Sequence, residues 1–269
     1  MALTSRPIVS IAVITKKTPF LILQRCIRSI REQTVSNLEI ILLDANDMDS
    51  SYKEAIKSEP DFLSDILYIE LPEGKEFVHG KNAVLKAYHG EFITFLSAQD
   101  TMPPKRIEQV LSVFAQDASI VTICTGMNVQ ENNILEHSDY AISSSQYQYL
   151  SQLIFHRDCF RYIHAFDENL IAHCDEDAAL QLFFLHQIHS VATEDTAVSV
   201  CPDCYHNVSE LAAAIGYRQL MTKYLPILSK NEPIKKQLME KAASSYQKAG
   251  VLHRYVQFKC KEVFSKKGY

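Results

Sequence analysis

The sequence predicts an α/β fold, in which helices flank a mostly parallel β-sheet and a helical extension follows at the C-terminus. Over the first half of the chain, short aliphatic and β-branched runs alternate with amphipathic segments. That order is typical of a parallel sheet with right-handed crossovers. From residue 208 onward, the patterns are helical. We therefore divide the chain into an α/β domain at residues 1–207 and a helical extension at residues 208–269.

The strands are expected where apolar residues run almost without interruption, because a parallel strand is buried on both faces. Five such runs lie at residues 8–14, 38–43, 66–71, 92–96 and 119–124. A later strand is expected at residues 192–201. The polar stretch at residues 126–148 indicates loops and short antiparallel strands.

The helices are expected where apolar residues recur with a helical period. Pro19 begins the first, and Leu23, Ile27 and Ile30 share one of its faces. Further helices are expected at residues 78–88, 103–116, 175–187 and 209–228, and from Pro233 onward, with a break at Gly250.

Composition excludes several classes of protein. The chain has 269 residues, of which 47% are hydrophobic and 22% charged, as in globular proteins. A net charge of -5 argues against a general nucleic-acid binder. No segment approaches the roughly 18 apolar residues of a membrane span, and the N-terminus lacks the apolar run of a signal peptide. We therefore expect a cytoplasmic protein whose seven cysteines are reduced thiols.

Two nucleotide-binding classes are also disfavoured. The chain has seven glycines and contains neither G-x-G-x-x-G nor G-x-x-x-x-G-K-[ST], the loops of dinucleotide-binding oxidoreductases and P-loop NTPases. A nucleotidyltransferase lacks support, because no loop rich in glycine and lysine lies near the N-terminus. The spacing Cys201-x-x-Cys204-x-His206 is similar to a zinc site, but no second C-x-x-C follows to complete the ligands.

Two places carry candidate chemistry. Asp44 follows a buried strand, and open α/β sheets bind ligands beyond the carboxyl ends of their strands. Asp175, Glu176 and Asp177 begin a helix. Crowded like charges raise the pKa of at least one member, which suits a general base. Both features have a structural alternative, since carboxylates also stabilise turns and helix N-termini.

The ordered set of motifs over residues 7–207 resembles the family 2 glycosyltransferases, which are inverting nucleotide-sugar enzymes of the GT-A fold. The matching segments are Pro7–Ile11, Cys26–Ile30 with Gln33-Thr34, Leu38–Asp44, Gly80–Asn82, Gly90–Leu96, Phe166–Leu170 and Glu176-Asp177.

The resemblance implies a set of donor-binding residues. Asp44 would accept a hydrogen bond from the uracil N–H of a UDP donor, and Thr15 occupies the other uridine-contacting position. Lys81 replaces the family's arginine near the base or diphosphate; it keeps the charge and loses the planar fork. A plain surface lysine is the alternative. Ala98 stands at a ribose-contacting position.

The resemblance also implies a metal turn, and there this chain departs from the family. The usual D-x-D-D is Ser97-Ala98-Gln99-Asp100, so a neutral amide at Gln99 replaces the metal-holding aspartate. Mg²⁺ or Mn²⁺ would bind weakly, because both prefer anionic oxygens. Asp100 could take over, and His206 stands where the family has a histidine near the diphosphate or metal. A weak metal site, replacement of the metal by cations such as Lys81, and inactivity all stay open.

For catalysis, the resemblance implies that Asp177 removes the proton of the acceptor hydroxyl, while Glu176 or Asp175 orients it or binds the acceptor. We expect the Asp177 carboxylate to point into the same cavity as Asp44 and the Gln99-Asp100 turn.

The interpretation is an inverting glycosyltransferase that transfers a hexosyl or N-acetylhexosaminyl group from a UDP-sugar in bacterial-type polysaccharide or glycoconjugate synthesis. The acceptor, whether saccharide, lipid-linked or protein, is open. The alternative is an inactive nucleotide-sugar-binding or scaffold protein with the same fold.

Residues 230–269 hold ten Lys and Arg against three Glu. This excess of positive charge suits a solvated helix face or peripheral contact with the inner, anionic membrane face.

Overall fold

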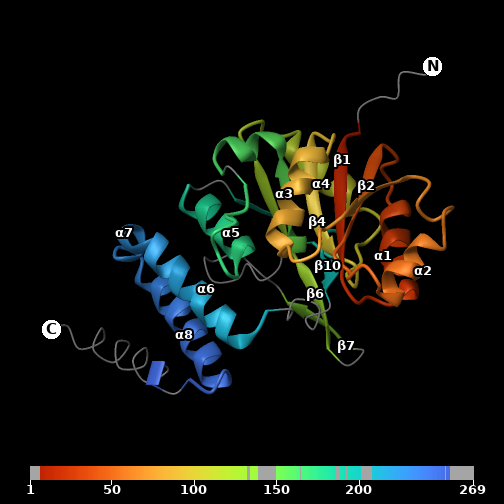
Figure 1. Ribbon diagram of the computed structural model, residues 1–269. Helices are drawn as coiled ribbons and strands as arrows, with labels where there is room; N and C mark the ends of the chain where they lie inside the picture. The colour runs from red at the N-terminus through yellow and green to blue at the C-terminus, as the bar shows by residue number, and fades with distance from the viewer. Residues whose placement is uncertain are drawn as a thin grey trace.

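A seven-stranded, mostly parallel sheet forms the centre of the molecule (Figure 1). The computed structural model describes residues 7–131, 134–138, 150–163, 165–185, 188–191, 193–200, 208–251 and 253–254. The strand order is β3-β2-β1-β4-β8-β5-β9, and β8 runs antiparallel to both of its neighbours. The strands are β1 (Val9–Thr15), β2 (Leu38–Asp44), β3 (Ile66–Glu70), β4 (Phe92–Ser97), β5 (Thr122–Thr125), β8 (Leu153–His156) and β9 (His189–Val191). The five expected strands are confirmed, and β8 is an addition.

Helices cover both faces of this sheet. They are α1 (Phe20–Arg31), α2 (Ser51–Lys57), α3 (Phe77–Ala87), α4 (Arg106–Phe114) and α5 (Cys174–Phe184). Apolar side chains of α1, α2 and α4 pack with Ile11 and Val13 in one core, and those of α3 and α5 pack with Ala12 and Leu43 in another. Neighbouring residues of one strand face opposite cores, as the pleat requires. The expected α/β layers are therefore confirmed.

The region after β5 is less regular. A three-stranded sheet in the order β10-β6-β7 is formed by β6 (Met127–Glu131), β7 (Ile134–Ser138) and β10 (Val198–Val200). Two short 3-10 helices, η1 (Leu150–Gln152) and η2 (Arg157–Arg161), flank β8. Of the strand expected at residues 192–201, the part at Val198–Val200 is confirmed as β10, and residues 193–197 are not in a strand. A turn closed by the Ala197 amide, which donates to the Thr193 carbonyl over 3.1 Å, separates β9 from β10.

The C-terminal helices pack against α5. They are α6 (Glu210–Lys223), α7 (Leu225–Leu228) and α8 (Glu232–Lys248). The helix expected at residues 209–228 is interrupted at Tyr224, next to Pro226, which has no N–H to donate. Tyr217, Leu220 and Tyr224 share a core with Phe183 and Phe184 of α5. No helix in the described part of the chain is both long and apolar enough to cross a bilayer.

Hydrogen bonds join two of the sequence motifs, Gly80–Asn82 and Phe166–Leu170. The Asn82 side chain donates to the Phe166 carbonyl over 2.9 Å and to Glu168 over 2.8 Å, and it accepts from the Phe166 amide over 3.0 Å. Gly80 allows α3 to lie close to β2, because a Cβ there would be 2.7 Å from the Leu43 side chain. These contacts fix the segment before α5 against α3, and so place Lys81 next to the start of α5.

Candidate functional site

The carboxyl ends of four parallel strands lie along one edge of the sheet. Thr15 is in register with Asp44, Asp44 with Glu70, and Ile14 with Ser97. The loops that follow these strands therefore gather at this edge, which is where open α/β sheets bind ligands.

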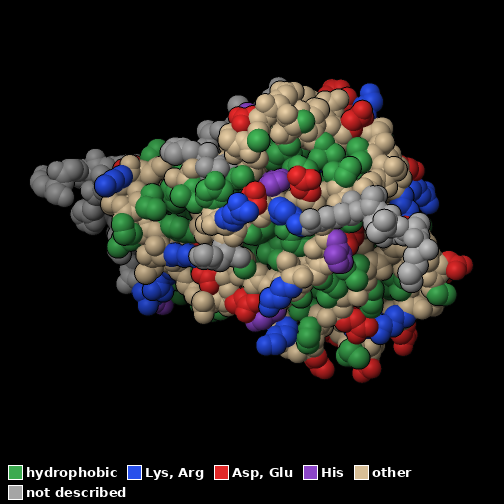
Figure 2. Space-filling model, turned by 90° about the horizontal axis from the view of Figure 1, so that it is seen from above, with side chains coloured by type: hydrophobic (Ala, Val, Ile, Leu, Met, Phe, Trp, Pro, Cys, Tyr) green, Lys and Arg blue, Asp and Glu red, His purple; other side chains and the backbone are tan. Residues whose placement is uncertain are grey.

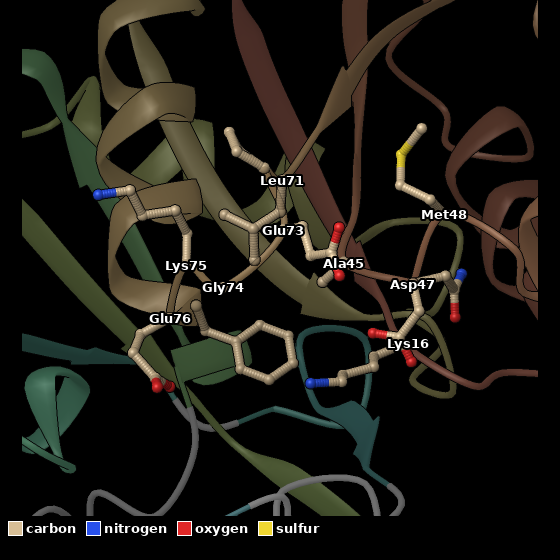
Figure 3. A pocket seen from close by; sticks show the side chains of 12 residues that line it. Lys16, Ala45, Asp47, Met48, Leu71, Glu73, Gly74, Lys75 and Glu76 are labelled. Atoms are coloured by element: carbon tan, nitrogen blue, oxygen red, sulfur yellow. The ribbon is translucent and has the colours of Figure 1, made fainter.

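The loops after β1, β2 and β3 enclose a small polar pocket (Figure 3). Its volume is about 260 Å³. Lys16 enters from one side, with its ammonium 5.1 Å from the centre of the Phe77 ring. The lining residues are Lys16, residues 45–48 and residues 71–77. Polar loops and the Phe77 ring give this pocket groups that could bind a nucleoside.

Asp44 lies beneath this pocket and does not line it. Its side chain is fully buried. One carboxylate oxygen accepts from the Asn46 amide over 2.9 Å and from the Asn46 side chain over 2.8 Å, and the other accepts from the Tyr68 hydroxyl. Burial, and then this hydrogen bond to Asp44, raises the pKa of Tyr68. Asp44 thus positions Asn46 on the pocket wall, and the direct uracil contact stays a prediction.

Thr15 and Ala98 are both fully buried and line neither cavity in the described part of the chain. The Thr15 carbonyl accepts from the Ala45 amide over 2.9 Å, and the Ala98 amide donates to the Ile14 carbonyl over 2.9 Å. The Thr15 hydroxyl has no hydrogen-bond partner among the described residues. Through their backbones, both residues hold the loops that form the edge, and their donor-binding roles stay predictions.

A larger cavity adjoins the small pocket. It has a volume of about 790 Å³ and shares Lys16, Glu76 and Phe77 with the small pocket. Its walls include Lys81 of α3, Gln99 after β4, the start of α5, and side chains of α6 and α8. The C-terminal helices therefore form one wall of this cavity.

Lys81 and Asp175 form an ion pair inside the larger cavity. The ammonium lies 2.5 Å from the carboxylate, and the two side chains are 8% and 24% exposed. Burial alone would lower the pKa of Lys81, but Asp175, followed by Cys174, raises it overall. Lys81 is thus a fixed cation, 5.6 Å from the centre of the Phe166 ring, and the surface-lysine alternative is wrong.

His173 links the start of α5 to α6. One ring nitrogen lies 3.0 Å from the Glu176 carboxylate and the other 3.0 Å from the Ala213 carbonyl, and the ring stacks on Tyr217 with centroids 3.8 Å apart. Gly216 permits this approach, because a Cβ there would lie 2.8 Å from the His173 ring. Burial would raise the pKa of Glu176, yet His173 holds it at about 2.

Asp177 does not point into the larger cavity, contrary to our expectation. Its side chain is fully buried. It accepts hydrogen bonds from Tyr224 over 2.7 Å, from Lys223 over 2.9 Å and from Gln181 over 3.0 Å. Tyr224 and Lys223 belong to the end of α6, so packing of that helix on α5 encloses the carboxylate. Asp175 and Glu176, by contrast, line the cavity, and the catalytic role of Asp177 stays a prediction.

The turn after β4 does not provide a metal site among the described residues. Asp100 is fully buried, and its carboxylate accepts from the Ser97 amide over 3.2 Å. Gln99 lines the larger cavity and offers only a neutral oxygen. No cluster of three His, Cys, Asp or Glu suited to a metal occurs in the described part of the chain. His206, Cys201 and Cys204 lie outside the described residues. Among the described residues, this turn therefore presents no carboxylate that could hold a divalent ion in the larger cavity.

Comparison with known proteins decides the family. The sequence profile of glycosyl transferase family 2 matches residues 10–186. This chain belongs to glycosyl transferase family 2. An uncharacterised glycosyltransferase of Nostoc sp. is 28% identical over 114 residues, 41% of this chain and 34% of that protein. EpsH, a proposed glycosyltransferase of Bacillus subtilis, is 29% identical over 126 residues, 44% of this chain and 33% of EpsH. The chain spans about a third of the length of these relatives.

Two solved structures share the GT-A fold with this family 2 chain. S. aureus TarS 1–349 in complex with UDP-GlcNAc has a TM-score of 0.63 at 14% identity, over 81% of this chain and 66% of that one. The mannosyltransferase PcManGT of Pyrobaculum calidifontis, in complex with GDP-Man and Mn²⁺, has a TM-score of 0.60 at 16% identity, over 92% of this chain and 76% of that one. The expected GT-A fold is confirmed.

Several site residues of this family 2 chain could not be found from its sequence motifs. On α8, Gln237, Lys241, Ser245 and Lys248 all line the larger cavity. Their spacing of four, four and three residues is that of one helical face, which is a signal visible in the sequence. The sequence alone did not indicate that this face turns toward the site, because that depends on how α8 packs.

Proposed function

We propose that this chain is an inverting glycosyltransferase that uses a nucleotide-sugar donor, most simply a UDP-sugar. The observation that carries the proposal is the pair of joined cavities at the carboxyl edge of the sheet, which share Lys16, Glu76 and Phe77. Their sizes suit a nucleoside and a sugar with its acceptor. In support, TarS has been crystallised with UDP-GlcNAc, although its likeness to this chain is one of fold.

In this proposal, the base and ribose occupy the small pocket next to Asn46. The diphosphate then spans the junction, where Lys16 lines both cavities and Lys81 lines the larger one. Negative charge develops on the leaving diphosphate during transfer, so cations fixed beforehand at this point stabilise the transition state. The two lysines would supply the charge that a metal supplies in a D-x-D enzyme.

The acceptor hydroxyl would attack the anomeric carbon as the bond to the diphosphate breaks, and its proton would pass to a carboxylate at the start of α5. The resemblance favours Asp177 for this role. Geometry favours Asp175, which lines the cavity and is ion-paired with Lys81. We propose Asp175 as the base in the described conformation, since a base must lie within hydrogen-bond reach of the proton that it removes.

A non-catalytic nucleotide-sugar-binding protein is the second candidate. One observation favours it: Gln99 is neutral and Asp100 is turned into the protein, so the acidic metal turn is lost.

A nucleic-acid partner has no support, because Figure 2 shows acidic and basic side chains interspersed on the face that it presents, with no broad basic surface there.

Calorimetry with UDP tests nucleotide binding and its metal dependence. We expect UDP to bind with similar affinity with and without Mn²⁺, because the described residues hold no metal site. Lys16→Ala should weaken UDP binding about tenfold, as loss of a hydrogen bond to a charged group does. Gln99→Asp should introduce a dependence on Mn²⁺.

The exposed lysine Lys86 on α3 serves as a matched control, and Lys86→Ala should bind UDP normally. Binding by the wild-type protein that occurs only with Mn²⁺ would contradict the lysine-based account. Absence of UDP binding under both conditions would overturn the proposed function itself.

We further propose that the tip of the C-terminal helices contacts an anionic membrane. Leu225 and Ile227 of α7 are 61% and 43% exposed, next to the exposed Lys230. Exposed aliphatic side chains beside a cation suit the headgroup region of a bilayer. Of the predicted segment, residues 230–269, residues 252 and 255–269 lie outside the described residues.

Sedimentation with phosphatidylglycerol vesicles tests this contact. The protein should sediment with vesicles at low salt and less at high salt, and Leu225→Glu should reduce the bound fraction severalfold. If the wild-type protein stays in the supernatant at low salt, the helices are a solvated cap and the membrane proposal is wrong.

A further inference from the structure

The larger cavity has a cation, on the wall formed by α8, that forms no ion pair with a carboxylate of the described residues. Lys241 lines the cavity together with Gln237, Ser245 and Lys248 of the same helix. Its ammonium lies 5.7 Å from the centre of the Tyr217 ring. Tyr217 is itself stacked on His173, so the platform beneath Lys241 is fixed to the start of α5.

The other charges around Lys241 are already matched. Asp175 is paired with Lys81 at 2.5 Å, Glu176 with His173 at 3.0 Å, and Glu210 with Lys248 at 3.6 Å. Lys241 forms no ion pair with any carboxylate of the described residues. Its charge still acts within the cavity, because it contributes, after His173, to lowering the pKa of Glu176.

The position of Lys241 separates it from the nucleotide. The small pocket is lined by loops after β1, β2 and β3, and no described residue of α6 or α8 lines it. Lys16 and Phe77 lie where the two cavities join, because they line both. The Lys81–Asp175 pair and the side chains of α8 line only the larger cavity. A donor that places its nucleoside in the small pocket therefore leaves the α8 wall to the acceptor.

We infer that Lys241 binds an anionic oxygen group, a phosphate or a carboxylate, on the acceptor, so that the acceptor is an anionic saccharide. This inference rests on the proposed function. The Lys241 ammonium, which no carboxylate of the described residues pairs, and the Ser245 hydroxyl on the same wall present a point charge and a polar group to such a group. A neutral acceptor would offer Lys241 no opposite charge, whereas an anionic one would form a charge-assisted hydrogen bond with it.

The experiment uses the full chain saturated with UDP, so that the nucleotide site is filled before the acceptor probe is added. Glucose 1-phosphate, glucuronate and glucose are titrated separately by calorimetry. The first two probes separate phosphate from carboxylate, and glucose is the uncharged reference. We expect at least one anionic probe to bind about tenfold more tightly than glucose, and Lys241→Gln to remove that difference.

Lys236→Gln is the matched control. Lys236 lies on the same helix, is 53% exposed and pairs with Glu240 instead of lining the cavity. This variant should behave as the wild type. The inference is overturned if Lys241→Gln keeps the preference, or if neither anionic probe binds better than glucose.

UDP affinity separates this inference from the proposed function. Lys241→Gln should bind UDP as the wild type does. Normal UDP binding without a preference for anionic probes overturns only the acceptor inference, whereas failure of the wild-type protein to bind UDP overturns the proposed function.

Discussion

Replacement of Asp175 by asparagine should lower the rate of sugar transfer roughly 10²–10⁴-fold, the usual effect of removing a positioned base. Asparagine keeps the shape of the side chain and can still accept a hydrogen bond from Lys81, so the fold should persist. UDP affinity should stay equal or increase, because Lys81 then has no carboxylate competing with the diphosphate. The measurement is the initial rate of UDP release at saturating donor, beside calorimetry with UDP.

Asp177→Asn separates the two candidate bases. If Asp175 is the base, Asp177→Asn should retain most of the transfer rate, provided the protein is assayed well below its unfolding temperature. The opposite pattern, with Asp177→Asn inactive and Asp175→Asn active, would contradict the geometric assignment. It would imply that α6 moves and exposes Asp177 when substrates bind.

Replacement of Lys223 by methionine should destabilise the protein by about 2–4 kcal/mol, because a buried carboxylate loses its charged partner. Asp177 is fully buried, while Lys223 is 33% exposed and also pairs with Asp167 at 2.7 Å. The hydrogen bonds from Tyr224 and Gln181 to Asp177 remain. We therefore expect a smaller loss in free energy of unfolding than for a buried carboxylate with no partner. Chemical unfolding of the variant and the wild type gives the difference in free energy of unfolding.

The control for this measurement is Lys236→Met, which removes a cation paired with Glu240 on the exposed face of α8. Surface pairs of this kind contribute at most about 1 kcal/mol. A loss for Lys223→Met that is no larger than that of the control would show that the Lys223–Asp177 contact does not hold α6 against α5.

The parallel strands and the edge at which ligands bind could be predicted from sequence, because both depend on local patterns. The aliphatic runs ending at Thr15 and Asp44 fix strand ends that the parallel register then brings together. By contrast, β8 runs antiparallel between β4 and β5 and has only four residues. So short a segment carries too little periodicity to be recognised.

The orientation of the site carboxylates could not be predicted, since it depends on partners far along the chain. Tyr68 and Asn46 both use the Asp44 carboxylate, and the Tyr68 contact exists only because β3 pairs with β2. Lys223 and Tyr224 enclose Asp177 from helix α6, about one-sixth of the chain away. Motif positions therefore identified the charged cluster, and tertiary packing decided which of its members face the cavity.

The most direct test of the central claim is a donor panel, in which UDP-sugars and GDP-sugars are incubated with the protein and an anionic saccharide acceptor and products are followed by mass spectrometry. We predict that a UDP-sugar is consumed with release of UDP, that a glycosylated acceptor forms without added metal, and that Asp175→Asn slows both roughly 10²–10⁴-fold. If UDP binds but no donor is consumed, with or without Mn²⁺, the protein is a nucleotide-sugar-binding member of glycosyl transferase family 2 and the enzymatic account is wrong.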